Sequence, residues 1–541
     1  MSSPFSEDHL IEQPTLELFR ELGWQTTNGY HEFDSAPGAA GRSPLGRETA
    51  ADVVLLPRLR QSLEKLNPGL PPEAVDLAIE ELTRGRGTLS LAAANRELYR
   101  LIKDGVTVRL GADGAAGPGS RPETTITVRV VAWDEPENND WLIVSQFWVL
   151  GELYTCRPDL VGFVNGLPLL LIELKAPGKG AAAAYKDNIR HYKEAIPQLL
   201  WYNALILATD GDSSRCGTLT ADWERYYDWK RINDEGEKGV ISWETMVRGL
   251  CAPARWLDLM ENFILYDENQ GGLAKIAAMN HQYLGTNNAL RALRSLGENQ
   301  GRLGVYWHTQ GAGKSYSMIF FAQKALRKLG GNYTFVIVTD RVELDGQIYD
   351  NFANCGAVTE KEAHADSGRE LQQLLRESHR YVFTLVQKFH TAKGEVYPVL
   401  STRSDIVVMT DEAHRSQYDL FALNMRTALP NAAFIGFTGT PLMVGEERTR
   451  QVFGEYVSVY NFSRSIEDKA TLPLYYENRI PELQLANEQL GDELEEVLEA
   501  AELDDAQEQR LEREFAREYH LITREDRLER IARDIVQHYM H

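Results

Sequence analysis

The spacing of apolar residues changes along the chain and predicts where its folded parts lie. Up to about residue 255, stretches with helical spacing are mixed with short apolar runs bounded by turn residues. The helical stretches are 6–24, 51–66, 72–84, 90–103 and 181–196. The short runs are 106–110, 124–133, 141–149, 160–164, 169–174 and 204–208. This mixture predicts an α/β domain with a mixed sheet over residues 1–255.

A regular alternation of strands and helices begins near residue 304. Its apolar runs are 305–307, 334–339, 381–385, 405–410 and 433–437, each followed by a helical or polar segment. Such an alternation predicts a parallel sheet that helices cover on both faces. A helical connector is expected between the two sheets, at about 256–298. The second α/β domain is therefore predicted to span residues 256–475.

The last part of the chain, 476–541, has a different composition. Residues 482–514 are dense in Glu, Asp, Gln and Ala and contain almost no aromatic residues. This composition predicts a long solvated helix or helical hairpin. An amphipathic pattern returns at 524–540, where a helix is expected.

Composition narrows the class of protein. The chain has 541 residues and a net charge of −22, which argues against a protein that coats nucleic acid by bulk charge. No apolar run approaches the roughly 20 residues of a membrane span, and the first residues lack a signal-peptide pattern. Four scattered cysteines form no CxxC pair. We therefore expect an acidic cytoplasmic enzyme away from membranes, without a zinc site or a disulfide framework.

A glycine-rich turn follows the strand predicted at 305–307. Gly311 and Gly313 leave backbone N–H groups free to surround phosphate oxygens, and a helix begins directly afterwards. In this interpretation Lys314 contacts the β- and γ-phosphates, Ser315 ligates Mg²⁺, and Thr309 opens the loop. The sequence therefore predicts an ATP site with Mg²⁺. The alternative is a glycine-rich turn that binds nothing.

The loop departs from the strict phosphate-loop pattern at one position. The pattern has glycine five residues before Gly313, and this chain has His308. The shorter form Thr-Gln-Gly-Ala-Gly-Lys-Ser resembles motif I of superfamily 2 helicases, which tolerate this change.

Two acids follow the apolar run at 405–410. A buried parallel strand that ends in acids is where an α/β sheet places its ligand site. Asp411 is expected to hold Mg²⁺, and Glu412 to position and deprotonate the attacking water. His414 is expected to couple this segment to the next motif. The alternative is an acidic cap on the following helix.

The order of these motifs resembles the first RecA-like domain of superfamily 2 DNA motors. Asp411-Glu412-Ala413-His414 matches the DEAH motif, and Thr438-Gly439-Thr440 matches motif III. Upstream, Asn280-His281-Gln282-Tyr283 resembles the Q motif, in which Gln282 reads the adenine edge. By itself this glutamine is more often an ordinary helix-surface residue.

A second group of chemical residues lies between 157 and 175. An Asn165-Gly166 turn separates two apolar strands, of which the second ends in Glu173-Leu174-Lys175. Residues i and i+2 of a strand share a face, so Glu173 and Lys175 point the same way, and the hairpin can bring Asp159 to them. Two carboxylates beside a lysine suit Mg²⁺-dependent phosphodiester cleavage. The alternative is an exposed strand edge.

These residues resemble the motif of PD-(D/E)xK nucleases. Pro158-Asp159 provides the PD pair and Glu173-Leu174-Lys175 the ExK triplet. The resemblance implies further site residues: Gln198 and Tyr202 match the QxxxY element of the RecB-like branch, and Glu12 is a candidate fourth acid on the metal side.

A nuclease domain followed by a DEAH motor resembles the restriction subunit of type I restriction-modification enzymes. The recurring family segments are Gly46-Arg47-Glu48, Leu66-Asn67-Pro68, Asn138-Asn139, Gln146, 157–175, His281-Gln282-Tyr283 and Ser465-Ile466-Glu467-Asp468. The resemblance implies cleavage of unmodified double-stranded DNA after ATP-driven translocation. It also implies methyltransferase and specificity subunits as partners in defence against foreign DNA.

Nothing in the chain matches the second RecA-like domain of that family. From the sequence we therefore expect a truncated chain that does not translocate DNA alone. Two rival interpretations stay open. One is a stand-alone nuclease-helicase of DNA repair or phage defence. The other is a non-catalytic assembly fragment.

Overall fold

The computed structural model describes residues 8–33, 43–111, 124–358, 364–365, 367–390, 397–411, 418–441, 447–468, 470–472 and 525–540. The chain divides into two compact units, which are Met1–Thr471 and Leu472–His541. Within the described residues, no helix is both long and apolar enough to cross a membrane.

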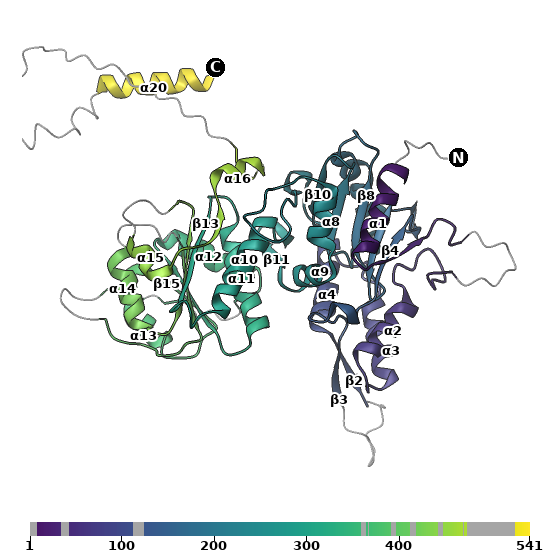
Figure 1. Cartoon of the computed structure of the whole chain (residues 1–541), viewed down its shortest axis with the longest axis horizontal. Helices are drawn as coiled ribbons and strands as arrows, with labels where there is room; N and C mark the ends of the chain where they lie inside the picture. The colour runs from purple at the N-terminus through teal and green to yellow at the C-terminus, as the bar shows by residue number, and fades with distance from the viewer. Residues whose placement is uncertain are drawn as a thin grey trace, which may run out of the picture. The chain divides into compact units, whose positions relative to one another are not determined.

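The first sheet of the larger unit has six strands in the order β1-β4-β7-β8-β9-β10 (Figure 1). Its strands are β1 (Gln25–Asn28), β4 (Trp141–Ser145), β7 (Leu160–Val164), β8 (Leu167–Leu174), β9 (Leu205–Thr209) and β10 (Ser214–Gly217). The pairs β1–β4 and β8–β9 are parallel, and the other neighbours are antiparallel. The predicted mixed sheet is therefore confirmed. All eight residues of β8 are buried, as their continuous apolar run indicates.

Helices pack around this sheet, and their boundaries follow ordinary signals. Pro72 occupies the first turn of α3, where its missing N–H is tolerated, and Ser90 caps α4 by accepting a hydrogen bond from Ala93 N at 3.3 Å. Trp243 of α8 donates to Thr15 Oγ1 of α1 at 2.7 Å, which joins two helices far apart in the sequence. The helical segments are η1 (Asp8–Glu12), α1 (Gln13–Glu21), α2 (Leu56–Leu66), α3 (Pro72–Thr83), α4 (Leu91–Asp104), η2 (Pro136–Asn138), α5 (Ala181–Ala183), η3 (Ala184–Ile189), α6 (Arg190–Ala195), α7 (Pro197–Leu200), η4 (Trp223–Arg225), α8 (Trp243–Cys251) and α9 (Pro253–Asn262).

Two short hairpins accompany the first sheet. The hairpin of β2 (Val106–Leu110) and β3 (Thr124–Val128) confirms the strand pair predicted at 106–133, although β3 ends earlier than expected. Its predicted tip, 112–121, lies outside the described residues. The other hairpin pairs β5 (Val149–Leu150) with β6 (Thr155–Cys156).

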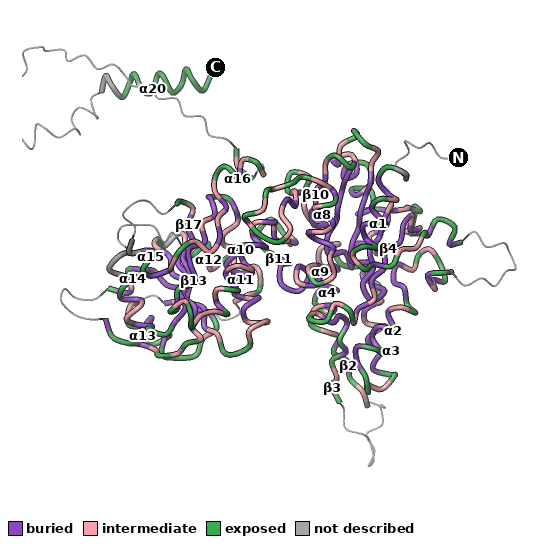
Figure 2. Tube along the Cα trace, in the orientation of Figure 1, coloured by how far each residue is buried: buried purple, intermediate pink, exposed green. Residues whose placement is uncertain are grey.

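The second sheet has six strands in the order β15-β14-β16-β17-β13-β18, and every pairing is parallel. The strands are β13 (Arg302–His308), β14 (Thr334–Thr339), β15 (Tyr381–Leu385), β16 (Ile406–Asp411), β17 (Ala433–Thr438) and β18 (Tyr456–Tyr460). The helical segments are α10 (Asn280–Arg294), α11 (Lys314–Leu329), α12 (Val342–Asn354), α13 (Gly368–Leu374), η6 (Val386–Phe389), α14 (Tyr418–Ala428), α15 (Glu447–Phe453) and α16 (Phe462–Glu467). The central strands are buried (Figure 2). This arrangement confirms the predicted parallel sheet.

The expectation of a helical connector at about 256–298 is wrong for residues 264–277. Between α9 and α10 the chain forms an antiparallel hairpin of β11 (Ile264–Asn269) and β12 (Gly272–Ala277). Gly272 has a φ of 107° at the turn, a conformation that favours glycine. Two Gly residues and a short apolar alternation therefore override the helical pattern on either side. Strands β10 and β18 were also not predicted.

The smaller unit has one described element, helix α20 (Glu525–Met540), which confirms the amphipathic helix predicted at 524–540. The helix predicted at 482–514 lies outside the described residues. The domain limits 1–255, 256–475 and 476–541 stay predictions.

The turn between β7 and β8 generates a stability prediction. Gly166 has a φ of 80°, and a Cβ there would lie 2.7 Å from both Leu55 O and Leu59 N. Alanine in this backbone conformation costs about 1–2 kcal/mol by itself, and the backbone clash adds to that cost. We expect Gly166→Ala to lower the melting temperature, measured by circular dichroism.

Gly178→Ala is the matched control. Gly178 has a φ of 84°, and a Cβ there would have no atom within 4 Å, so this change carries only the conformational cost. A decrease for Gly166→Ala no larger than that for Gly178→Ala contradicts the packing described for this turn.

Candidate phosphate-binding and nuclease sites

The carboxyl ends of the parallel strands place the motifs of the second sheet at one edge. Strand β13 leads into the glycine-rich loop, β16 ends at Asp411, and β17 leads into Thr438-Gly439-Thr440. Strand β17 pairs with both β13 and β16, so these three ends are neighbours. Ligands of α/β sheets bind at such an edge.

The glycine-rich loop has the backbone geometry of a phosphate-binding turn. Gly311 and Gly313 have φ values of 79° and 75°, and α11 begins at Lys314. Lys314 is half-buried, and its Nζ lies 3.4 Å from His308 O. A Cβ on Gly439 would lie 3.2 Å from this Nζ, which places the lysine beside the loop after β17. The α11 N-terminus and this lysine form a site suited to an anion.

Two residues at the start of α10 contact backbone carbonyls of the loop. Gln282 is buried, and its Nε2 donates to Gly313 O at 3.0 Å while its Oε1 accepts from Met279 N at 2.9 Å. His281 Nε2 lies 3.1 Å from Ala312 O. These contacts hold the loop carbonyls of Ala312 and Gly313, while the Ala312 N–H donates to Thr309 O at 3.2 Å. Reading of adenine by Gln282 stays a prediction.

A cavity of about 500 Å³ opens beside the loop. Gly311, Gly313, Gln282 and Tyr316 line one side, and β12 and the segment after β10 line the other. The volume lies within the range typical of small-molecule sites. A nucleotide whose phosphates lie on the loop has room here for its base and sugar.

The remaining predicted residues of this site are only partly described. Thr309 is buried, and its N–H donates to Tyr460 O at 3.0 Å. Ser315 lies half-buried in the first turn of α11, and Asp411 is half-buried at the end of β16. Glu412 and His414 lie outside the described residues, so their predicted roles stay predictions.

The acids of the first sheet meet where β7 begins and β8 ends. Leu174 N donates to Asp159 Oδ2 at 2.8 Å, and Asp159 N donates to Glu173 Oε1 at 3.3 Å. Glu173 is fully buried, and its Oε2 finds no hydrogen-bond partner in the part of the chain that the structure describes. The structure therefore brings the two predicted carboxylates together.

Burial raises the pKa of both carboxyl groups. The pKa of Glu173 lies well above its ordinary value, because of burial first and the neighbouring charge of Asp159 second. Burial also raises the pKa of Asp159, against hydrogen bonds and the charges of Lys175 and Arg157 that lower it. Two buried acids in contact repel each other when both are ionised, and a bound cation relieves that repulsion.

Sequence reasoning missed two residues of this site. Lys175 Nζ donates to Asn188 Oδ1 at 2.7 Å, and Asn188 Nδ2 donates to the Tyr192 hydroxyl at 3.3 Å. The pKa of Tyr192 is raised by burial first and by the charge of Glu173 next. Asn188 lies in η3 and Tyr192 lies in α6, four residues later, and the hydrogen bond between them shows that they lie side by side. In the sequence, the only indication of these two residues is their four-residue spacing within a predicted helix that follows the Glu173-Leu174-Lys175 triplet.

Gln198 and Tyr202 make hydrogen bonds to other parts of the domain. Gln198 Nε2 donates to Leu150 O at 2.9 Å, and the buried Tyr202 hydroxyl donates to Leu82 O at 2.9 Å. Their side chains are thus engaged by backbone carbonyls, while Asn188 and Tyr192 occupy the helix beside Lys175. The catalytic role predicted for Gln198 and Tyr202 gains no support from these contacts.

Glu12 approaches the acids through Gln146. Gln146 Nε2 donates to Glu12 Oε2 at 2.8 Å, and Gln146 N donates to Asp159 O at 2.7 Å. Gln146 has a φ of 55°, a strained conformation for a residue other than glycine. The buried Glu12 is therefore one residue removed from Asp159, and its role as a metal ligand stays a prediction.

The donor set fits Mg²⁺ at the nuclease acids. Carboxylate oxygens are the ligands that Mg²⁺ prefers, and Glu173 offers one oxygen that no described donor occupies. Among the described residues, no group of three or more His, Cys, Asp or Glu side chains is arranged as a metal site. Mg²⁺ would thus be held by the Asp159 and Glu173 pair together with water and substrate oxygens.

The acid pair predicts a specific dependence of stability on pH. The pKa of Glu173 is higher in the folded protein than in the unfolded chain. In the absence of divalent cations, the free energy of unfolding therefore falls as pH rises from the pKa of the unfolded state through the pKa of the folded state. Glu173→Gln removes this loss, so we expect it to raise the melting temperature more at pH 8 than at pH 5. Melting with EDTA at both values measures the difference. An equal change at both values contradicts a buried, proton-binding Glu173.

Comparison with known proteins agrees with both parts of this geometry. Residues 4–225 match the family described as the type I restriction enzyme R protein N terminus. Residues 281–509 match the SWI2/SNF2 ATPase family, which implies ATP as a ligand. The UvsW helicase of bacteriophage T4 aligns with 37% of this chain and 66% of its own, at 15% identity and a TM-score of 0.27, too low to support a conclusion.

Relatives over nearly the whole chain are endonuclease subunits. The type I restriction enzyme HindI endonuclease subunit of Haemophilus influenzae is 34% identical over 98% of this chain and 51% of its own length. A candidate type I restriction enzyme MjaIXP endonuclease subunit of Methanocaldococcus jannaschii is 29% identical over 99% of this chain and 52% of its own. The chain thus spans about half the length of these relatives. It joins the N-terminal region of type I restriction enzyme R proteins, at residues 4–225, to a SWI2/SNF2 ATPase region, at residues 281–509, as a type I endonuclease subunit does over its matched half.

Proposed function

We propose that the chain binds and hydrolyses ATP at the loop after β13 and cleaves DNA at the acidic end of β8. Both activities belong to a type I restriction enzyme that cuts unmodified foreign DNA. The supporting observation is that the glycine-rich loop and Glu173, one of whose buried oxygens no described donor contacts, occur in one compact unit. Double-stranded DNA is the proposed substrate, and methyltransferase and specificity subunits are the proposed partners.

At the ATP site, the residues position phosphates and a cation. Backbone N–H groups between Gly311 and Gly313 surround phosphate oxygens, and Lys314 contacts the β- and γ-phosphates. Ser315 and Asp411 hold Mg²⁺, which neutralises phosphate charge when it is bound. Glu412 orients the attacking water. Gln282 holds the loop through Gly313 O, and the adjoining cavity accommodates the base.

At the nuclease site, the carboxylates hold a cation and the lysine supports the reaction. Asp159 and Glu173 would hold Mg²⁺, which would supply an activated water and stabilise charge on the phosphate. Lys175 follows β8 directly and stabilises the developing negative charge. Asn188 holds the Lys175 ammonium at 2.7 Å and orients it. Glu12 contributes on the metal side through its contact with Gln146.

We also propose the domain limits 1–255 for the nuclease, 256–475 for the first RecA-like domain and 476–541 for an acidic helical segment. The two six-stranded sheets, which lie within the first and second of these ranges, support this division.

Lys314→Ala tests the ATP site. We expect it to weaken binding of a fluorescent ATP analogue by the full chain by roughly 100-fold or more, because one charge-assisted contact to phosphate contributes about 1.5–3 kcal/mol and this lysine makes several. Fluorescence titration measures the affinity. Arg341→Ala, an exposed cation after β14, is the control, and equal affinity of Lys314→Ala and wild type contradicts the assignment.

Asp159→Ala, Glu173→Ala and Lys175→Ala test the nuclease site. Each is expected to stop Mg²⁺-dependent nicking of plasmid DNA while the ATP analogue still binds, because the two sites lie on different sheets. Gel electrophoresis measures nicking, and Asp187→Ala, an exposed acid on η3, is the matched control.

The same assay decides between the proposal and a non-catalytic assembly fragment. Nicking that persists in all three variants contradicts the proposed nuclease. Absence of nicking by the wild-type chain in the assembled complex contradicts it as well.

A further inference from the structure

The segment 226–280 lies between the two regions that match known families, and it reaches the ATP site. Within it, a loop at 230–237 packs against the second sheet. Arg231 N donates to Asn280 Oδ1 at 3.0 Å, and Arg231 Nε donates to Glu237 O at 2.9 Å. Ile232 N donates to Glu237 Oε2 at 2.8 Å. These bonds hold the loop in one conformation beside α10.

Glu235 extends from this loop to β18. Its Oε2 accepts a hydrogen bond from Val459 N at 2.9 Å, and its Oε1 accepts one from Ser458 Oγ at 2.5 Å. Ser458 Oγ also lies 2.7 Å from Nε2 of His308, the last residue of β13. A continuous hydrogen-bonded chain therefore joins Glu235 to the residue that precedes the phosphate loop.

The direction of each hydrogen bond in this chain follows from the donors available. The Val459 N–H can only donate, so Glu235 accepts there. Burial raises the pKa of Glu235, against the hydrogen bonds from Ser458 and Val459 and the Arg464 charge, which lower it. A serine hydroxyl has one hydrogen, which Ser458 gives to Glu235. Ser458 must then accept from His308, so the His308 ring carries its hydrogen on Nε2.

The environment of His308 keeps its ring neutral. The side chain is fully buried, and burial first, then the charges of His281, Lys314 and Arg464, lower its pKa well below the ordinary value. A neutral imidazole carries one hydrogen, so Nδ1 is left without one. This Nδ1 is buried and has no hydrogen-bond partner in the described parts of the chain.

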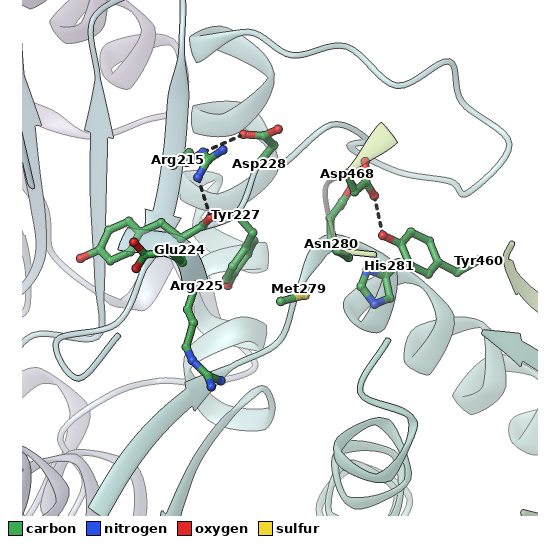
Figure 3. Close-up of a pocket in the computed structure, with 12 residues that line it drawn as sticks. Arg215, Glu224, Arg225, Tyr227, Asp228, Met279, Asn280, His281, Tyr460 and Asp468 are labelled. Carbon is green, nitrogen blue, oxygen red and sulfur yellow. Dashed lines mark hydrogen bonds and ion pairs between the residues drawn. The ribbon is translucent and has the colours of Figure 1, made fainter. Parts of the chain in front are cut away.

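A second connection reaches the same junction from the other side. Lys230 Nζ pairs with Asp468 Oδ1 at 2.5 Å, and Asp468 Oδ2 accepts from the Tyr460 hydroxyl at 2.9 Å. The Tyr460 ring stacks on His281, with centroids 3.8 Å apart, and Figure 3 shows the side chains of Asp468, Tyr460 and His281 together. Because His281 contacts Ala312 O, residues 230 and 235 both connect to the loop through intermediate side chains.

We propose that Glu235 is a positioning residue of the ATP site, which acts through Ser458 to hold His308 in the tautomer that carries its hydrogen on Nε2. The fixed ring holds the end of β13, where the phosphate loop begins and where Lys314 contacts His308 O. The segment between the nuclease and ATPase regions is thus a structural part of the ATP site. This inference rests on the proposed ATP function.

Glu235→Gln reverses the chain of hydrogen bonds without removing atoms. Val459 N still requires an acceptor, so the amide oxygen stays there and the amide nitrogen faces Ser458. Ser458 then accepts from the new amide and donates to His308 Nε2. The hydrogen of His308 is expected to move to Nδ1. Nitrogen NMR of the full chain with ¹⁵N-histidine detects this shift, and a His308→Asn sample assigns the signal among the 12 histidines.

Nucleotide affinity reports the consequence. We expect Glu235→Gln and Ser458→Ala each to weaken binding of a fluorescent ATP analogue by about 2- to 12-fold, the range for one hydrogen bond. The double variant is expected to bind the analogue no more weakly than Ser458→Ala alone does, because Glu235 acts through Ser458. Glu455→Gln, an exposed acid next to β18, is the matched control and should change neither signal nor affinity.

Each outcome decides the proposal. A tautomer shift together with non-additive loss of affinity supports it. An unchanged His308 signal in Glu235→Gln overturns it, as does additive loss in the double variant, which would mean that Glu235 only stabilises β18. A tautomer shift with unchanged affinity overturns the positioning role. Failure of wild type to bind the analogue contradicts the proposed ATP function instead, while the NMR result still decides the link between Glu235 and His308.

Discussion

A carboxylate buried at the end of a strand must bind a proton or meet a positive charge, and the Asp159 and Glu173 site depends on this requirement. Strand β8 is buried along its whole length and brings Glu173 beside Asp159. Strand β16 is buried up to its final residue, Asp411, at the edge where the phosphate loop begins. Two buried carboxylates in contact are costly when both are ionised, so the Asp159 and Glu173 pair favours a bound proton or cation.

The glycine-rich loop after β13 is held from outside, because side chains of neighbouring segments contact its carbonyl oxygens. Gln282 and His281 bind Gly313 O and Ala312 O, and Ser458 holds the ring of His308. Position 308 is where the strict pattern has glycine, and here an imidazole joins the strand end to β18. The histidine that replaces the glycine of the pattern therefore links β13 to β18.

Much of the fold was predictable because its strands are short, continuous apolar runs. The 160–164 and 334–339 runs are β7 and β14 with the expected limits. The β11–β12 hairpin was missed because helical patterns flank it and only the Gly271-Gly272 pair marks the turn. Strand β18 carries half-buried residues at the sheet edge, so its pattern is weak. Such strands are specified by tertiary pairing more than by local sequence.

The candidate sites were likewise predictable only in part. Asp159, Glu173 and Lys175 follow from strand alternation and a tight turn, and the structure brings the two acids together. The partners of Lys175 do not follow from strand patterns, because Asn188 and Tyr192 lie on a π-helical segment and the helix after it. The role of Glu235 requires contacts across more than 200 residues of sequence, which no local pattern contains.

The most direct test of the central claim is to locate cations at the two strand ends. Crystals of the full chain, soaked with Mn²⁺ and a non-hydrolysable ATP analogue, give anomalous density wherever the metal binds. We predict one peak between Asp159 and Glu173 and a second between Ser315 and Asp411, beside the phosphates. A nucleotide-associated peak with no density at the Asp159 and Glu173 pair would contradict the account of a metal-dependent nuclease site.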